Sequence, residues 1–236
     1  MDLPGILSYR VERLKFKATN LDLALALVAT FLLPVVCWLL LDWSGALLPL
    51  ILYYGVFCVA IVLWRKKSLD YVRPVSWSFK LFIGLLALQI FIQTIAFLTI
   101  IPANDPWEGV LLTLLIWVPI NAAMEQLLWV YIFDAFETRW TERRKRFIGG
   151  VIGMLLAIIF VGLIHVLFWS KFLPSFESIT PWSQIFLIAQ FLITPGYLLL
   201  YRRTGSMWPV FAIHIIADAV LVLGAMYSIW PTLWTL

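Results

Sequence analysis

Long apolar runs separated by short polar breaks dominate this chain. A helix needs about 20 mostly apolar residues to cross a membrane, and seven segments reach this length. We predict spanning helices at Leu21–Leu41, Ala46–Trp64, Phe79–Ile101, Glu108–Phe133, Phe147–Trp169, Trp182–Leu200 and Met207–Ile229. The predicted fold class is therefore all-α, a polytopic transmembrane helix bundle with about seven spanning helices.

Basic residues fall in alternate loops, which predicts the orientation of the bundle. Of the 17 Lys and Arg residues, only Lys171 lies on one side, which leaves 16 for the other. Cytoplasmic loops carry the excess of Lys and Arg. We therefore expect a cytoplasmic N-terminus and an outward-facing C-terminus.

Composition excludes a soluble protein. The chain is 63% hydrophobic and only 13% charged, whereas about 25% of residues are charged in soluble domains. The net charge of +4 comes from the basic loops that predict the orientation in the membrane. It does not indicate a nucleic-acid partner. We expect a multi-pass integral protein of a prokaryotic inner (cytoplasmic) membrane.

The whole chain, 1–236, is predicted to be a single membrane domain with three parts. Residues 1–20 form a basic segment, with Arg10 and Arg13 among apolar residues, which lies along the membrane surface as an amphipathic helix or forms a disordered tail. Three spans without a usable motif follow at 21–101. Four spans at 107–229 form the core that carries the candidate chemistry.

Four ionisable residues lie inside predicted spans: Glu125, His165, His214 and Asp218. Such a side chain at bilayer depth costs about 2.5 kcal/mol or more unless it is paired or solvated. The chain has only two histidines, and both belong to this set. The concentration of these residues in spans four, five and seven predicts a site between the helices.

Helical spacing brings further side chains to this site. His214 and Asp218 are i and i+4, so they share one face of their helix. Asn121 lies one turn before Glu125, and Gln126 is adjacent to it, so we regard both as supporting residues. Two hydrolytic chemistries fit: Glu125 as general base on a water with imidazoles that orient it or stabilise an oxyanion, or a zinc ion that activates the water. Interhelical hydrogen bonds that hold the bundle together are the non-catalytic alternative.

The sequence Glu125-Gln126, then His165, then His214-x-x-x-Asp218 resembles the CPBP intramembrane protease family, also called the CAAX protease or Abi family. Members carry E-E-x-x-x-R, F-x-x-x-H and H-x-x-x-N/D motifs on successive core helices. The stretch from Ser206 to His214 is especially similar to the last motif. The resemblance covers about Trp107–Ile229.

This resemblance implies an intramembrane endopeptidase in which Glu125 activates the water that attacks a peptide bond. His165 matches the histidine of the second motif, and His214 and Asp218 match the third motif, which binds the water or the oxyanion. The substrate would be a membrane-associated peptide or a prenylated protein. No cofactor is favoured; if a zinc ion were present, Glu125, His165, His214 and Asp218 would hold it.

Three departures from the family motifs support a second hypothesis. Gln126 replaces the second glutamate, Val130 replaces the arginine, and Val161 replaces the phenylalanine, although Phe160 is adjacent. The lost glutamate and arginine would have neutralised each other, so their joint loss leaves no unpaired buried charge. The alternative is a catalytically inactive, CPBP-like subunit that binds and stabilises another integral membrane protein. A transporter or proton relay ranks last, because no inverted repeat is visible.

Two geometric expectations concern span five. At about 1.5 Å per residue, His165 lies about 27 Å above Phe147, whereas Glu125 lies about 13 Å above its own cytoplasmic end. His165 reaches the other site residues only if its helix tilts strongly or begins outside the membrane, as the resemblance favours. Gly149 and Gly153 have the spacing that permits close helix packing. Trp169 is one of eight tryptophans near span ends, most of which an interfacial aromatic belt explains.

Overall fold

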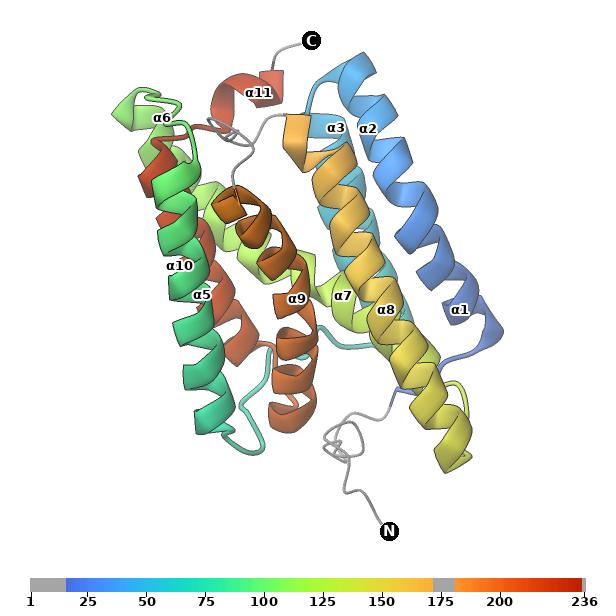
Figure 1. Cartoon of the computed structure of the whole chain (residues 1–236). Helices are drawn as coiled ribbons and strands as arrows, with labels where there is room; N and C mark the ends of the chain where they lie inside the picture. Colours follow the sequence, from blue (N-terminus) through green and yellow to red (C-terminus); the bar gives the residue numbers. More distant parts are fainter. Residues whose placement is uncertain (1–15, 172–180, 235–236) are drawn as a thin grey trace.

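The computed structural model describes residues 16–171 and 181–234, so most of the basic segment 1–20 lies outside the described residues. Within these ranges the chain is helical and contains no β-strand (Figure 1). The α-helices are α1 (Asn20–Leu27), α2 (Leu33–Ser44), α3 (Leu47–Leu50), α4 (Val62–Lys66), α5 (Phe79–Thr99), α6 (Trp107–Leu112), α7 (Val118–Glu137), α8 (Arg143–Leu167), α9 (Pro181–Thr204), α10 (Trp208–Ala225) and α11 (Trp230–Trp234). Segments Val28–Leu32, Ile51–Ile61 and Thr113–Trp117 are π-helical and join neighbouring α-helices, and a 3₁₀ turn covers Trp169–Lys171.

Six helical runs in the described ranges are long and apolar enough to cross a membrane. They are Asn20–Ser44, Leu47–Lys66, Phe79–Thr99, Trp107–Glu137, Arg143–Lys171 and Trp208–Ala225. These runs confirm the all-α transmembrane bundle, and the protein is a multi-pass integral membrane protein. Helix α9 lies where the sixth span is expected but is not one of these six, so the count of seven and the cytoplasmic N-terminus stay predictions.

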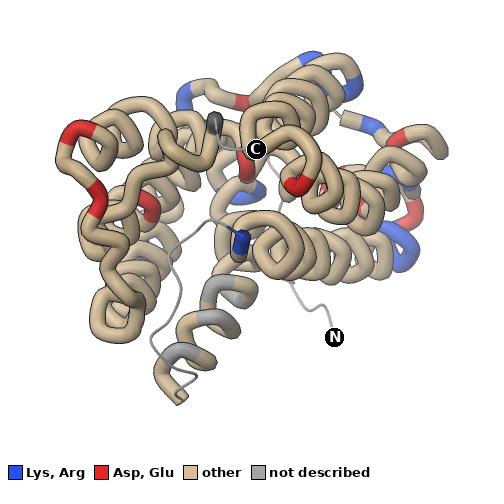
Figure 2. Tube along the Cα trace, turned by 90° about the horizontal axis from the view of Figure 1, so that it is seen from above, with Lys and Arg blue, Asp and Glu red and all other residues tan. Residues whose placement is uncertain are grey.

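The outer surface of the bundle is apolar, as a lipid-facing surface must be. Leu98 is 75% exposed and Leu115 is 73% exposed, and large apolar side chains of other spans also point outward. A view along the bundle shows how few residues carry charge (Figure 2). Because lipid cannot hydrogen-bond to the backbone, each span satisfies its backbone groups within its own helix.

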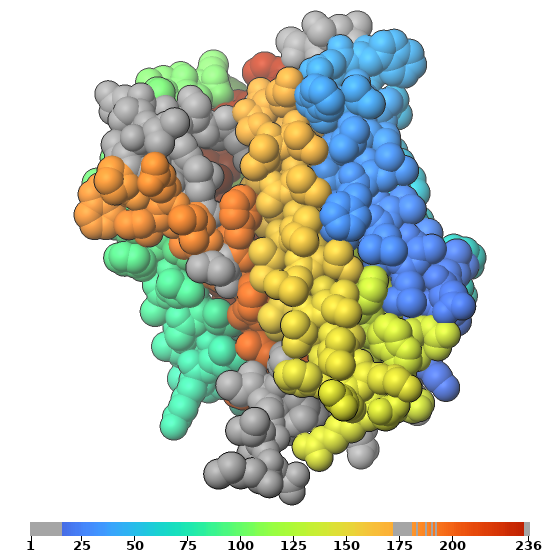
Figure 3. All heavy atoms as spheres, turned by 45° about the vertical axis from the view of Figure 1, so that its right-hand side comes forward, coloured from blue at the N-terminus to red at the C-terminus, as the bar shows by residue number. Residues whose placement is uncertain are grey.

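Helix α7 lies at the centre of the bundle and positions the candidate site. Every residue from Glu125 to Glu137 is buried, and α7 packs against α8, α10 and the segment Ile51–Ile61. A helix that is covered on all sides can present polar groups to several neighbours. Helix α8 lies between α1–α2 and α9 on the surface shown in Figure 3.

Two glycines allow α8 to pack closely on α7. A Cβ at Gly153 would lie 2.6 Å from the carbonyl oxygen of Phe133, and one at Gly149 would also clash, with the carbonyl oxygen of Phe136. The predicted close packing at these glycines is therefore confirmed. The first turns of α8 also extend beyond the neighbouring ends of α5 and α9 (Figure 1).

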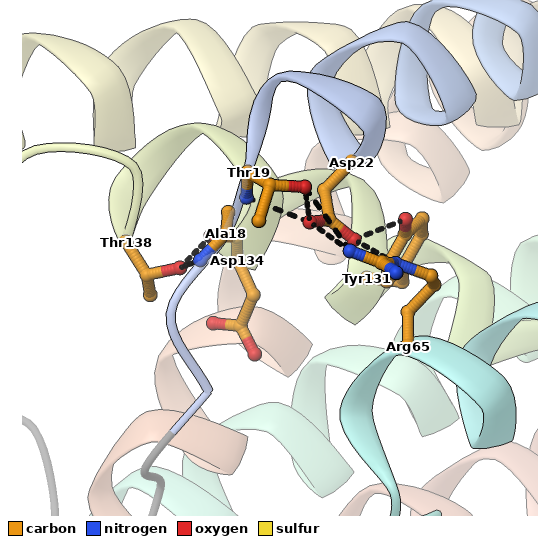
Figure 4. A network of polar contacts seen from close by, with 7 residues as sticks. All are labelled: Ala18, Thr19, Asp22, Arg65, Tyr131, Asp134 and Thr138. Carbon is orange, nitrogen blue, oxygen red and sulfur yellow. Dashed lines mark hydrogen bonds and ion pairs between the residues drawn. The ribbon is translucent and has the colours of Figure 1, made fainter.

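Charged side chains pair at the end of the bundle nearest the N-terminus. Asp22 of α1, whose side chain is fully buried, bonds Arg65 of α4 at 2.8 Å and accepts a hydrogen bond from Tyr131 of α7 at 2.9 Å (Figure 4). Lys66 pairs with Asp134 at 2.9 Å, and Glu137 pairs with Arg202 at 3.1 Å.

These contacts join four helices, α1, α4, α7 and α9. A buried charge without a partner is expensive, so these pairs constrain how the helices fit together.

Candidate active site

Glu125 lies on α7, and each of its carboxylate oxygens has a different environment. Oε1 accepts hydrogen bonds from the Tyr53 hydroxyl at 2.8 Å and from Trp169 Nε1 at 3.1 Å. Oε2 faces Nε2 of His214 at 3.6 Å. Glu125 is only 2% exposed, so the two donors provide the hydrogen bonds that a buried carboxylate needs.

His214 and Asp218 lie one turn apart on α10, as their spacing predicts. Nε2 of His214 is 3.6 Å from Oδ1 of Asp218, the same distance as from Glu125. The other oxygen of Asp218, Oδ2, accepts a hydrogen bond from Nδ2 of Asn121 at 2.8 Å. The Tyr54 hydroxyl in turn donates to Oδ1 of Asn121. The structure thus brings together three of the four predicted site residues and Asn121.

His165 takes a different position from the other three residues. It is half-buried on α8, and its Nδ1 lies 2.8 Å from the carbonyl oxygen of Val161. Its ring contacts Phe191 of α9 edge-on at 6.2 Å between centroids.

The position of Trp169 explains how α8 reaches the depth of the site. Its indole, 2% exposed, lies inside the bundle against Glu125. Trp169 is therefore not one of the tryptophans that an aromatic belt explains. The 3₁₀ turn that follows α8 thus brings the Trp169 side chain into contact with Glu125.

Gln126, which departs from the family motif, is fully buried and hydrogen-bonded at both ends. Its Oε1 lies 2.7 Å from Nδ1 of His214, and its Nε2 donates to the Tyr71 hydroxyl at 3.1 Å. Tyr71 lies in the loop between α4 and α5. Burial raises the pKa of Tyr71 above its ordinary value, against the lowering effect of the hydrogen bond from Gln126.

Three tyrosines that the sequence did not indicate thus contact the site. Tyr53 and Tyr54 come from the π-helical segment Ile51–Ile61, and Tyr71 comes from the loop that follows α4. Their hydroxyls bond Glu125, Asn121 and Gln126, respectively. The signal that could have found them is a pair of adjacent tyrosines within an otherwise apolar span, but their partners are too distant in sequence to identify.

The residues around Glu125 do not fit a zinc ion. Zinc binds imidazole nitrogen at about 2.0–2.1 Å and usually takes three or four protein ligands. Within 16–171 and 181–234, no group of three or more His, Cys, Asp or Glu side chains is arranged to hold a metal ion.

Comparison with known proteins supports the family resemblance. Residues 106–220 match the family model described as type II CAAX prenyl endopeptidase, Rce1-like. Neither a curated protein nor a solved structure matches the chain. The matched segment contains α7, α8, α9 and most of α10, and thus Glu125, His165, His214 and Asp218. This match supports the CPBP/CAAX protease family for the core of the chain, a family whose fold is an intramembrane helix bundle.

Proposed function

We propose that the protein is an intramembrane endopeptidase in which Glu125 is the general base. The observation that carries this proposal is the convergence of Glu125 Oε2 and Asp218 Oδ1 on Nε2 of His214, each at 3.6 Å. Atoms at this separation can share one water within hydrogen-bond distance. Buried, fixed dipoles around such a water act more strongly than they would in bulk solvent.

The proposed reaction is hydrolysis of a peptide bond. Glu125 takes a proton from the water while the water oxygen bonds to the scissile carbonyl carbon. The carbon–nitrogen bond then breaks, and the proton held by Glu125 passes to the leaving amine. His214 and Asp218 orient the water, and His165 is the proposed hydrogen-bond donor to the carbonyl oxygen of the substrate.

The proposed substrate is the C-terminal peptide of a prenylated, membrane-associated protein. CAAX proteases as a family act on such substrates. Prenylation takes place on the cysteine of a C-terminal C-a-a-X sequence, so cleavage would release the last three residues. The proposed location is a prokaryotic inner membrane, with the basic loops in the cytoplasm, and its support is the one-sided distribution of Lys and Arg.

The test uses the full chain in lipid bilayers and a farnesylated peptide that ends in C-a-a-X. Glu125→Gln keeps the shape of the side chain, and cleavage should fall at least about 100-fold, the usual contribution of a general base. Glu108→Gln, an exposed position in α6, is the matched control and should cleave at the normal rate. Normal cleavage by Glu125→Gln would rule out this residue as the base.

A second candidate function is an inactive subunit that stabilises another membrane protein. It is favoured by Val130 and Gln126 at motif positions and by the hydrogen bonds that occupy Oε1 of Glu125. If the natural chain releases nothing from prenylated or unprenylated peptides and co-purifies with a stoichiometric membrane partner, this function replaces the first.

A further inference from the structure

Gln126 occupies the position of the family's second glutamate, but its contacts are specific to this chain. It is 0% exposed, and both ends of its amide are hydrogen-bonded, to His214 and to Tyr71. A glutamine amide has an oxygen that only accepts and a nitrogen that only donates. The orientation of this amide therefore decides which proton His214 carries.

Tyr71 fixes the orientation of the amide. Its hydroxyl lies 2.5 Å from the backbone carbonyl oxygen of Ala123. Because a carbonyl can only accept, the single hydroxyl proton of Tyr71 must point to Ala123. The hydroxyl oxygen is then left to accept from Nε2 of Gln126, and Oε1 of Gln126 must face Nδ1 of His214.

We propose that Tyr71 and Gln126 are positioning residues that hold the proton of His214 on Nδ1 and leave a lone pair on Nε2. This inference rests on the proposed function, in which that lone pair accepts a hydrogen bond from the attacking water. Without the hydrogen bonds of Tyr71 and Gln126, a proton on Nε2 of His214 would be favoured, because Nε2 faces two carboxylates at 3.6 Å.

The loop that carries Tyr71 is held firmly against the core. The amide of Met207 donates to the carbonyl oxygen of Asp70 at 3.0 Å, and the Ser206 hydroxyl donates to that of Val72 at 2.5 Å. The Tyr71 ring packs edge-on against Trp208 at 5.1 Å. This loop lies outside residues 106–220, so the first half of the chain supplies the residue that orients a core histidine.

The experiment measures the imidazole nitrogens of His214 by ¹⁵N NMR in the full chain with labelled histidine. Because the chain has two histidines, His165→Gln assigns the signals. We expect a protonated Nδ1 and an unprotonated Nε2 in the natural chain. In Tyr71→Phe the amide of Gln126 can turn over, and the proton should move to Nε2.

Two further variants make the test specific. Tyr131→Phe removes another buried hydroxyl of the bundle, one that bonds Asp22, and should leave the His214 proton on Nδ1. Tyr71→Phe combined with Gln126→Glu should restore the proton to Nδ1, because a carboxylate accepts in any orientation and no longer needs Tyr71.

In the cleavage assay, Tyr71→Phe should lower kcat about tenfold or more with little change in KM, as the loss of an orienting partner does at other sites. Tyr71→Phe combined with Gln126→Glu should recover part of the lost kcat. A proton on Nε2 in the natural chain, or no change in Tyr71→Phe, would overturn the inference. An inactive natural chain with the expected NMR result would instead contradict the proposed function and leave the inference standing.

Discussion

At the scale of single residues, the site is a cluster of acceptors with few donors. Glu125 Oε2, Asp218 Oδ1 and, in the inferred tautomer, His214 Nε2 all face one another, and each can only accept. Donors lie on the outer side of the cluster: Tyr53 and Trp169 bond Glu125, and Asn121 bonds Asp218. Such an arrangement is satisfied when a water or a substrate group donates into the centre.

Replacement of Asp218 by asparagine should therefore stabilise the protein. The amide oxygen can still accept from Asn121, and one fewer charge is buried beside Glu125 and His214. We expect a gain of about 1–3 kcal/mol, the range for satisfying a buried polar group, and cleavage within about tenfold of normal, since the family motif accepts either residue. Thermal unfolding in detergent measures the gain.

Asp218→Leu is the matching control, because it leaves the Asn121 amide without its acceptor and should be less stable than the natural chain. A destabilised Asp218→Asn would show that the carboxylate charge is needed for folding.

At the scale of elements, two helices carry the chemistry and a third supports them. Trp117, Asn121, Glu125 and Trp129 recur at intervals of four along the helix that contains α7, so they share a face. Helix α10 presents His214 and Asp218 to this face, and the close approach of α8 allows Trp169 to reach Glu125. The position of α8 depends on the glycines that contact Phe133 and Phe136.

Gly153→Ala should separate α8 from α7. The added Cβ would lie 2.6 Å from the carbonyl oxygen of Phe133 and 3.0 Å from its Cα, and overpacking of this kind costs about 1–3 kcal/mol. Gly162→Ala on the same helix meets no atom within 4 Å, and it should be neutral or stabilise by up to about 1 kcal/mol because alanine favours helix. Equal thermal midpoints for the two variants would mean that the helices do not pack closely at Gly153.

At the scale of the whole molecule, the first half of the chain and the family core are joined by polar contacts. Tyr53 and Tyr54 bond residues of α7, and Lys66 pairs with Asp134 of α7 and with Asp70 of the α4–α5 loop. Burial alone would raise the pKa of Asp70, but Lys66, Tyr201 and Ser68 lower it below its ordinary value. The loop that carries Tyr71 is thus anchored by an ionised Asp70.

This pKa predicts how stability depends on pH. Because the folded pKa of Asp70 is below the unfolded value of about 3.9, its contribution is fully present above pH about 4 and is lost as the pH falls through the folded pKa. Asp70→Asn should therefore be less stable than the natural chain by about 1–3 kcal/mol at pH 7, and the difference should shrink below pH about 4.

Unfolding midpoints of both proteins across this pH range provide the measurement. Asp42→Asn, at a side chain that is 55% exposed, should show no difference at any pH. A constant difference between Asp70→Asn and the natural chain down to pH 2 would contradict the argument.

The sequence by itself determined the helices and the faces of those that carry the site. Apolar runs of this length must be helical in lipid because each backbone group needs a partner within its own segment. The i, i+4 spacing then placed His214 beside Asp218 and Asn121 beside Glu125. Motif order was enough to indicate the family, which the match over 106–220 supports.

Only the tertiary structure decided which partners surround the site. Nothing in the local pattern distinguishes Tyr53, Tyr71 or Trp169 from tyrosines and tryptophans that face lipid or the membrane surface, since one hydroxyl or indole in an apolar run leaves the helical period unchanged. Their roles depend on contacts between segments that are 44 to 72 residues apart. The same contacts show what surrounds Gln126. This residue replaces the second glutamate of the family motif, and in the structure it is hydrogen-bonded between Tyr71 and His214.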